Sequence, residues 1–179
     1  MIVASIATPR WVTYSVTTPL GDRLEKHIGL HKSCSTLDEP HCRPFPHREL
    51  CQAGQRYFCD MWKTIGFLSS LSVVLCLACL VTFVVVMRGG KYKRETGWPF
   101  VTVMMGLVSG VEFLIISMVA YLYDHDKQFI VPGWKLDISW IFGTVGASLC
   151  LLISAGLTTS AFVLPPEDGY NFLEDPVDS

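Results

Sequence analysis

Three long apolar stretches dominate the pattern of hydrophobic and polar positions. Residues 64–87 and 138–164 contain no Asp, Glu, Lys or Arg, and residues 98–123 contain a single such residue, Glu112. A transmembrane helix needs roughly 20 consecutive, predominantly apolar residues to cross the hydrocarbon core of a bilayer. The pattern therefore predicts three transmembrane helices over these ranges, and we expect them to form an antiparallel bundle.

The N-terminal residues 1–63 follow a different pattern, in which short β-prone runs are separated by turn signals. Residues 11–18 are rich in β-branched and aromatic side chains, and the sequence Pro-Leu-Gly-Asp at 19–22 is typical of a turn. Alternate positions from Leu24 to Leu30 share one face of a second strand. The predicted fold class is therefore membrane α+β, with a small β-sheet next to three helices.

The remaining connecting segments are expected to be mainly loop. Residues 35–48 contain three prolines and little hydrophobic pattern. Residues 51–62 are predicted to form either a short helix or an extended lead into the first span. Between the second and third spans, Gln128–Val131 is a candidate for one more strand at the edge of the sheet, with Pro132 and Gly133 ending it.

Charged residues set the expected orientation. They make up only 17% of the chain, whereas about a quarter is usual for a soluble domain. The segment 88–97 has one acidic residue and four basic residues, Arg88, Lys91, Lys93 and Arg94. Because short loops rich in Lys and Arg stay on the cytoplasmic side, we expect 88–97 to be a cytoplasmic loop.

This orientation determines where the other segments lie. Residues 1–63 and the loop 124–137 are expected outside the cell, and the acidic tail 165–179 is expected in the cytoplasm. The net charge of −2 gives no argument for nucleic acid as a partner. The expected partners are the lipid bilayer and either a second copy of the chain or another membrane protein.

Cysteine positions support the same orientation. Four of the seven cysteines lie in residues 1–63, at Cys34, Cys42, Cys51 and Cys59. Four cysteines in a short, loop-rich segment suggest two disulfides, which persist only in an oxidising compartment. A zinc site is less favoured because none of the gaps has the C-x-x-C spacing that zinc sites usually contain. The spacing alone leaves all three disulfide pairings open.

A tryptophan, a Gly-Leu pair and two cysteines follow one another in the N-terminal region, at Trp11, Gly29, Leu30, Cys34 and Cys42. In order and spacing they resemble the signature of the claudin and peripheral-myelin-protein superfamily, whose first outer loop carries a Trp, then Gly-Leu-Trp, then two Cys. The chain departs from the motif at His31, where the family has Trp. The two extra cysteines and the acidic tail are most similar to the fungal Sur7/PalI branch.

The resemblance implies a disulfide between Cys34 and Cys42, which leaves Cys51 and Cys59 as the second pair. It also implies four spans, whereas only the apolar run 1–7 precedes Trp11. Seven residues cannot cross a bilayer. We therefore expect that this start site omits a first span, rather than that the chain is a three-span variant, and that Trp11 consequently has no tether.

Within the predicted spans, Glu112 is the only ionisable acid or base. It is expected to be hydrogen-bonded to Ser, Thr or backbone on a neighbouring helix; a proton- or ion-linked site and a contact with a partner protein are the alternatives. Small residues that allow close helix packing occupy Gly106, Gly110, Gly143, Gly146 and Ala147. We expect them to pack the bundle, with self-association as the alternative.

The sequence contains no Gly-rich phosphate loop, metal cluster or nucleophile–base motif, so we expect a non-catalytic protein without a cofactor. The resemblance implies that it organises membrane domains, adhesion or the interface between cell surface and cell wall, and the expected location is the plasma membrane. One alternative is an accessory subunit of a membrane receptor or channel, including one in ambient-pH signalling. Another is a small transporter or pore former, for which Glu112 is the only indication.

Overall fold

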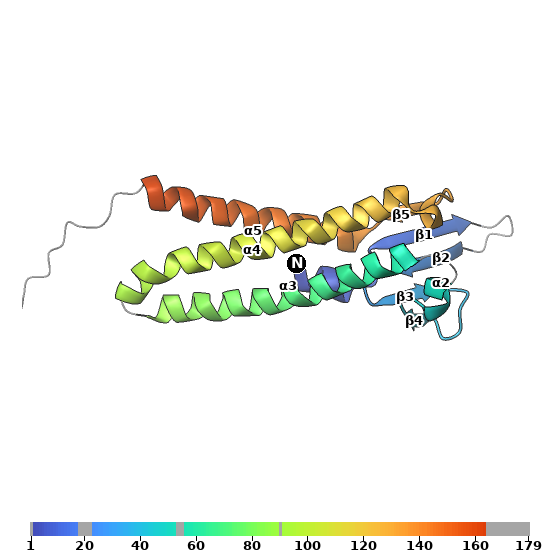
Figure 1. The fold of residues 1–179 in the computed structure, drawn as a ribbon, viewed down its shortest axis with the longest axis horizontal. Coiled ribbons are helices and arrows are strands. Elements are labelled where there is room, and N and C mark those ends of the chain that lie inside the picture. Colours follow the sequence, from blue (N-terminus) through green and yellow to red (C-terminus); the bar gives the residue numbers. More distant parts are fainter. Residues whose placement is uncertain (1, 18–22, 53–55, 90, 164–179) are drawn as a thin grey trace, which may run out of the picture.

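Three long helices run side by side, and a small sheet covers one of their ends (Figure 1). The computed structural model describes residues 2–17, 23–52, 56–89 and 91–163, with only the backbone described for 91–96 and 161. The described residues include three helices that are long and apolar enough to cross a membrane, as predicted. This architecture is that of an integral membrane protein. The helices are α3 (Arg56–Arg88), α4 (Lys91–His125) and α5 (Ile138–Val163).

Helix α4 lies between α3 and α5 and packs against both (Figure 1). Helix α3 begins at Arg56, ahead of the predicted start at residue 64, so residues 56–62 are helical. Helix α4 begins at Lys91, inside the segment expected to be a loop. At that end a Cβ on Gly97 would collide with the side chain of Val86, so this glycine lets α3 and α4 approach closely.

The sheet is antiparallel throughout, with the strand order β4-β3-β2-β1-β5. The two strands predicted on either side of residues 19–22 are present and pair with each other, with Val12 opposite Ile28. The prediction of loop for 35–48 is wrong at Cys42–Pro44, which form β4. The strands are β1 (Val12–Thr17), β2 (Arg23–Ile28), β3 (Lys32–Ser35), β4 (Cys42–Pro44) and β5 (Trp134–Leu136).

The later loop does add a strand to the sheet edge, but the predicted position is wrong. Residues 127–129 form a 3₁₀ turn, capped by the Asp126 carboxylate, which accepts the Gln128 N–H at 2.9 Å. The strand β5 follows Gly133 instead of preceding it. Gly133 has a φ of 119°, a conformation that favours glycine, and it turns the chain so that β5 pairs with β1.

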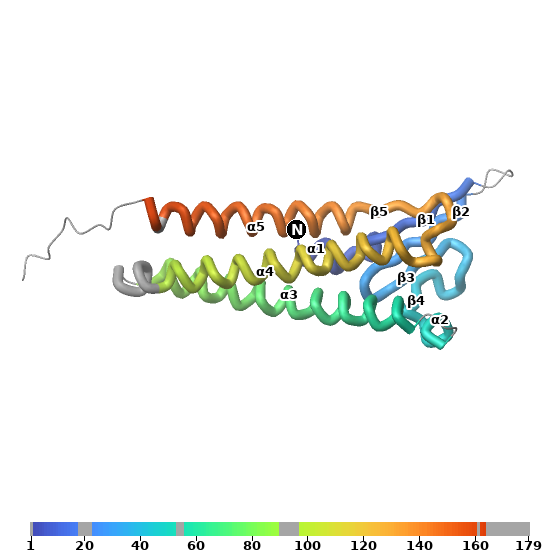
Figure 2. The backbone as a smooth tube through the Cα atoms, turned by 45° about the horizontal axis from the view of Figure 1, so that its top comes forward, coloured from blue at the N-terminus to red at the C-terminus, as the bar shows by residue number. Residues whose placement is uncertain are grey.

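One cluster of buried side chains joins the sheet to the helices. The short helices α1 (Ile2–Ala7) and α2 (Arg48–Gln52) flank this junction, and α1 packs mainly on α5 (Figure 2). The sheet, α3, α4 and the loop before β5 all contribute to the cluster. Its members include Trp11, Ile28, Phe58, Trp62, Ile115, Leu122 and Phe129.

Candidate functional site

Trp11 is the central residue of the junction between the sheet and the helices. Its side chain is fully buried, and its indole N–H donates to the Ser5 carbonyl of α1 at 2.9 Å. Its backbone N–H donates to Ile28 of β2, and its carbonyl accepts from Asp137 ahead of α5. A Cβ on Gly143 of α5 would meet the indole at 3.5 Å. The expectation that Trp11 lacks a tether is therefore wrong, because α1, β2 and α5 all hold it.

The adjacent motif residues Gly29 and Leu30 form the turn between β2 and β3. A Cβ on Gly29 would lie 2.5 Å from the Cα of Pro9, which no real Cβ tolerates, so the close approach of these two backbones requires glycine. The Leu30 carbonyl accepts the indole N–H of Trp62 on α3 at 3.3 Å. The motif therefore positions the turn against both the N-terminal segment and α3.

Two disulfides cross-link this end of the molecule. Cys34 pairs with Cys42, so that β3 and β4 are joined at directly opposite residues. Cys51 pairs with Cys59, which joins α2 to the start of α3. These are the two pairings that the resemblance implies. Together they attach the edge strand β4 to β3 and the short helix α2 to α3.

A cluster of polar side chains that the sequence did not reveal links β1, β2 and α5. The Thr13 hydroxyl donates to the Asp137 carboxylate at 2.5 Å and lies 3.0 Å from His27 Nδ1. His27 Nε2 lies 3.5 Å from a carboxylate oxygen of Glu25. Asp137 also accepts the N–H of Ile138 at 2.8 Å and so caps the first turn of α5.

This arrangement superficially resembles a nucleophile with a histidine base and an orienting acid. However, Thr13 is buried, and its single hydroxyl hydrogen is directed to Asp137 rather than to His27. It is therefore positioned to accept a hydrogen bond from the imidazole and not to attack a substrate. The hydrogen bonds of Thr13, His27 and Asp137 instead connect the sheet to α5, and we call these three residues the polar clasp.

The Asp137 clasp predicts a loss of stability in acid. Partial burial acts to raise the pKa of Asp137, but the hydrogen bonds from Thr13 and the Ile138 N–H, with the charges of Arg10 and His27, lower the pKa overall. A carboxylate with a lowered folded-state pKa stabilises the fold above its unfolded pKa of about 3.9, and this contribution disappears as pH falls through the folded value. Asp137→Asn keeps a capping side chain but removes the charge, so we expect it to cost about 1 kcal/mol at neutral pH and to remove this part of the acid sensitivity.

Thermal unfolding in detergent, recorded from neutral pH to below pH 4, measures both effects. Asp124→Asn is the matched control, because its carboxylate is exposed and its ion-pair partner among the described residues is the exposed His125. If the two variants unfold at the same temperature throughout the pH range, the clasp does not contribute to stability.

Inside the predicted spans, Glu112 lies at the contact between α3 and α4 and is fully buried. The Ser72 hydroxyl of α3 donates a hydrogen bond to Glu112 Oε1. Glu112 Oε2 has no hydrogen-bond partner among the described residues. The expected hydrogen bond to a serine on a neighbouring helix is therefore present, although half of the carboxyl group remains unsatisfied.

Substitution of Glu112 is expected to depend on whether an acceptor remains. Glu112→Gln keeps an oxygen for Ser72 and a similar shape, so it should be tolerated. Glu112→Leu leaves Ser72 without this acceptor and places a branched side chain in a closed contact, which costs about 1–3 kcal/mol. Expression level and thermal unfolding in detergent measure the effect.

A double-mutant cycle with Ser72→Ala isolates the pair. The cost of Glu112→Leu should be smaller when Ser72 is already alanine. Equal expression and equal unfolding temperatures of Glu112→Gln, Glu112→Leu and the parent would contradict this role of the carboxyl group.

The predicted small packing residues do not form one continuous face. Gly106 faces α5, where a Cβ would meet Ser154 at 3.5 Å, and the carbonyl of the buried Ala147 accepts the Ser109 hydroxyl at 3.0 Å. Gly110, in contrast, is exposed and has nothing within 4 Å of an added Cβ, so it does not pack the three helices together. Gly146 is buried on α5 beside a cleft of 380 Å³ that free thiols partly line.

The four predicted basic residues lie at the opposite end of the molecule from the sheet. Arg88 ends α3 and is exposed, and Lys91, Lys93 and Arg94 fall in the first turns of α4, where their side chains are outside the described part of the chain. The predicted acidic tail at 165–179 also lies outside the described residues.

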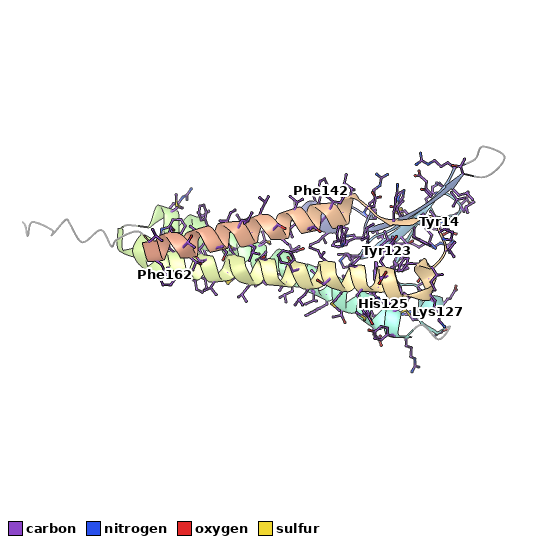
Figure 3. All side chains as sticks on the ribbon, turned by 90° about the horizontal axis from the view of Figure 1, so that it is seen from above. Tyr14, Tyr123, His125, Lys127, Phe142 and Phe162 are labelled. Carbon is purple, nitrogen blue, oxygen red and sulfur yellow. A yellow bond between two sulfur atoms is a disulfide. The ribbon has the colours of Figure 1, made fainter. Side chains whose placement is uncertain are left out.

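The sheet end carries large apolar side chains that are exposed outside the long helices. Ile130 is 72% exposed and the adjacent Val131 is 53% exposed, in the loop before β5, and Leu37 is 71% exposed between β3 and β4. Figure 3 shows Tyr14 and Lys127 at this end of the molecule and Phe162 at the other. The Tyr123 hydroxyl donates to the Trp134 carbonyl at 2.9 Å and so fixes the base of the loop.

Comparison with known proteins does not extend this description. No family model and no curated protein matches the chain. The resemblance to the claudin superfamily therefore stays a prediction that rests on Trp11, Gly29, Leu30 and the first disulfide.

Proposed function

We propose that this chain is a non-catalytic membrane protein that organises membrane domains or adhesion through contacts of its sheet end and of its helices. The observation that carries the proposal is the exposure of Ile130 and Val131 at the sheet end. Exposed apolar side chains outside a bilayer are typical of protein–protein contact sites when they cluster. Here they are presented on a framework that two disulfides and the Trp11 junction hold in place.

The orientation belongs to the same proposal. The sheet faces outside, and the end where α3 meets α4 faces the cytoplasm, at the plasma membrane. The disulfides at the sheet end support this direction, because they persist in an oxidising compartment. The basic residues near the other end of the helices support it independently.

The test is the clustering of a fluorescently tagged chain in cells that make it. We expect the parent to form patches that recover slowly after photobleaching, and Ile130→Ser/Val131→Ser to recover at least several times faster. The matched control is Asp124→Ser/Lys135→Ser, which alters two exposed polar residues at the same end. Equal recovery of the parent and the Ile130/Val131 variant would contradict the proposed contact.

An accessory subunit is distinguished by its partner. Co-purification of one stoichiometric partner, together with rapid recovery after photobleaching, would favour a role as an accessory subunit of a receptor or channel over self-organised patches.

A transporter function would rest on Glu112, whose Oε2 is unsatisfied among the described residues. Ion flux in reconstituted vesicles that depends on Glu112 would favour that function.

A further inference from the structure

Two hollows meet where the turn between β2 and β3 lies against α3. The first has a volume of 490 Å³ and extends from Lys32 past α1 to Val73 of α3. The second has a volume of 280 Å³ and lies between Lys63 and Phe67 of α3 and the same turn. Both hollows have Leu30 and His31 in their walls, so the turn separates them.

The backbone of the turn between β2 and β3, which carries His31 and leads into Lys32, is held in a fixed position. The Gly29 N–H donates to the Lys32 carbonyl at 2.8 Å, and the Phe45 N–H donates to the His31 carbonyl at 3.0 Å. A Cβ on Gly66 of α3 would lie 3.4 Å from the His31 ring. The imidazole is therefore close to the backbone of α3.

The mouths of the hollows are positively charged. Lys32, Lys63 and His31 are all exposed, and no acidic side chain among the described residues lines either hollow. In the part of the chain that the structure describes, neither lysine forms an ion pair. Their charges are therefore available to an anion from solvent or from a membrane.

Below the charged mouths the walls become apolar and enter the predicted span. Lys63 immediately precedes the apolar stretch 64–87, whereas Phe67 and Val73 lie further along α3 within it. The basic groups therefore lie at the level where lipid headgroups meet the hydrocarbon core. An occupant must have an anionic head and an apolar tail to match both parts.

We propose that these two hollows form a binding site for an anionic phospholipid in the leaflet on the sheet side. The headgroup phosphate contacts Lys32, Lys63 and His31, and the acyl chains lie along α3 below them. Such a lipid satisfies the charge of the mouth and the apolar character of the walls at once. The site would couple the sheet to the composition of that leaflet.

The test measures retention of phosphatidylglycerol by the full, detergent-solubilised chain in native mass spectrometry. We expect the parent to retain phosphatidylglycerol in preference to phosphatidylcholine. Lys32→Gln/Lys63→Gln should weaken retention about fivefold for each lysine removed. The matched control, Lys127→Gln/Lys135→Gln, removes two exposed lysines at the same end that line neither hollow, and it should bind like the parent.

Four results would overturn the proposal. Retention unchanged in Lys32→Gln/Lys63→Gln would show that these residues do not bind the lipid. An equal loss in both double variants, or equal retention of phosphatidylcholine by the parent, would show a general surface effect. Inorganic phosphate can contact the basic groups but not the apolar walls, so it should not displace a lipid that contacts both. Displacement of the lipid by millimolar inorganic phosphate would therefore assign the basic groups to a free anion.

Discussion

Replacement of Trp11 by alanine is expected to cost about 3–5 kcal/mol of stability, the range measured for buried aromatic side chains. Trp11 is fully buried where α1, β2 and α5 meet. The substitution leaves a cavity against Gly143 and removes the hydrogen bond to the Ser5 carbonyl. Thermal or denaturant unfolding of the detergent-solubilised chain measures the loss.

Two further variants separate the contributions of Trp11. Trp11→Phe keeps most of the ring and removes the indole N–H, so we expect a loss of about 1 kcal/mol from the hydrogen bond and an additional smaller loss from packing. Trp98→Ala is the matched control, because Trp98 is only half-buried and lies at the opposite end, near Phe83. Equal destabilisation by Trp11→Ala and Trp98→Ala would mean that the junction is not held by Trp11.

Loss of the disulfide between Cys51 and Cys59 is expected to cost about 2–4 kcal/mol. The bond ties α2 to the start of α3, where Cys59 is buried beside Phe58 and Trp62. Cys51→Ser/Cys59→Ser removes the cross-link, so the unfolded chain can adopt more conformations and its entropy rises. Unfolding under non-reducing conditions measures the difference from the parent.

The control is Cys79→Ser, because Cys79 is a free thiol within α3. A reducing agent should lower the unfolding temperature of the parent and of Cys79→Ser, and it should have a smaller effect on Cys51→Ser/Cys59→Ser, which retains only the Cys34–Cys42 bond. If the reducing agent affects all three proteins equally, the Cys51–Cys59 bond contributes nothing to the folded state.

The sequence predicts the long helices well because their signal is local and strong. A stretch such as 64–87 is long and apolar enough to identify a helix without any tertiary information. The true start of α3 at Arg56 could not be predicted in the same way. The first turns of that helix bury Phe58 and Trp62 against the turn of the sheet, so their helical state depends on contacts with distant residues.

The sheet shows the same division between local and distant signals. The β1–β2 pair follows from β-prone runs around a turn sequence, whereas β5 depends on the φ of Gly133 and on pairing with β1. The polar clasp joins Thr13 to Asp137, which lies 124 residues further along the chain. Nothing local in the sequence indicated that these two residues would meet.

Cysteine labelling in intact cells tests the central proposal most directly, namely three spans with the sheet outside. Leu37→Cys introduces a thiol in the exposed loop between β3 and β4, and Gly89→Cys introduces one just after α3. We predict that a membrane-impermeant maleimide labels Leu37→Cys in intact cells and labels Gly89→Cys only after permeabilisation. Labelling of both residues in intact cells, or of Gly89→Cys alone, would contradict the proposed topology.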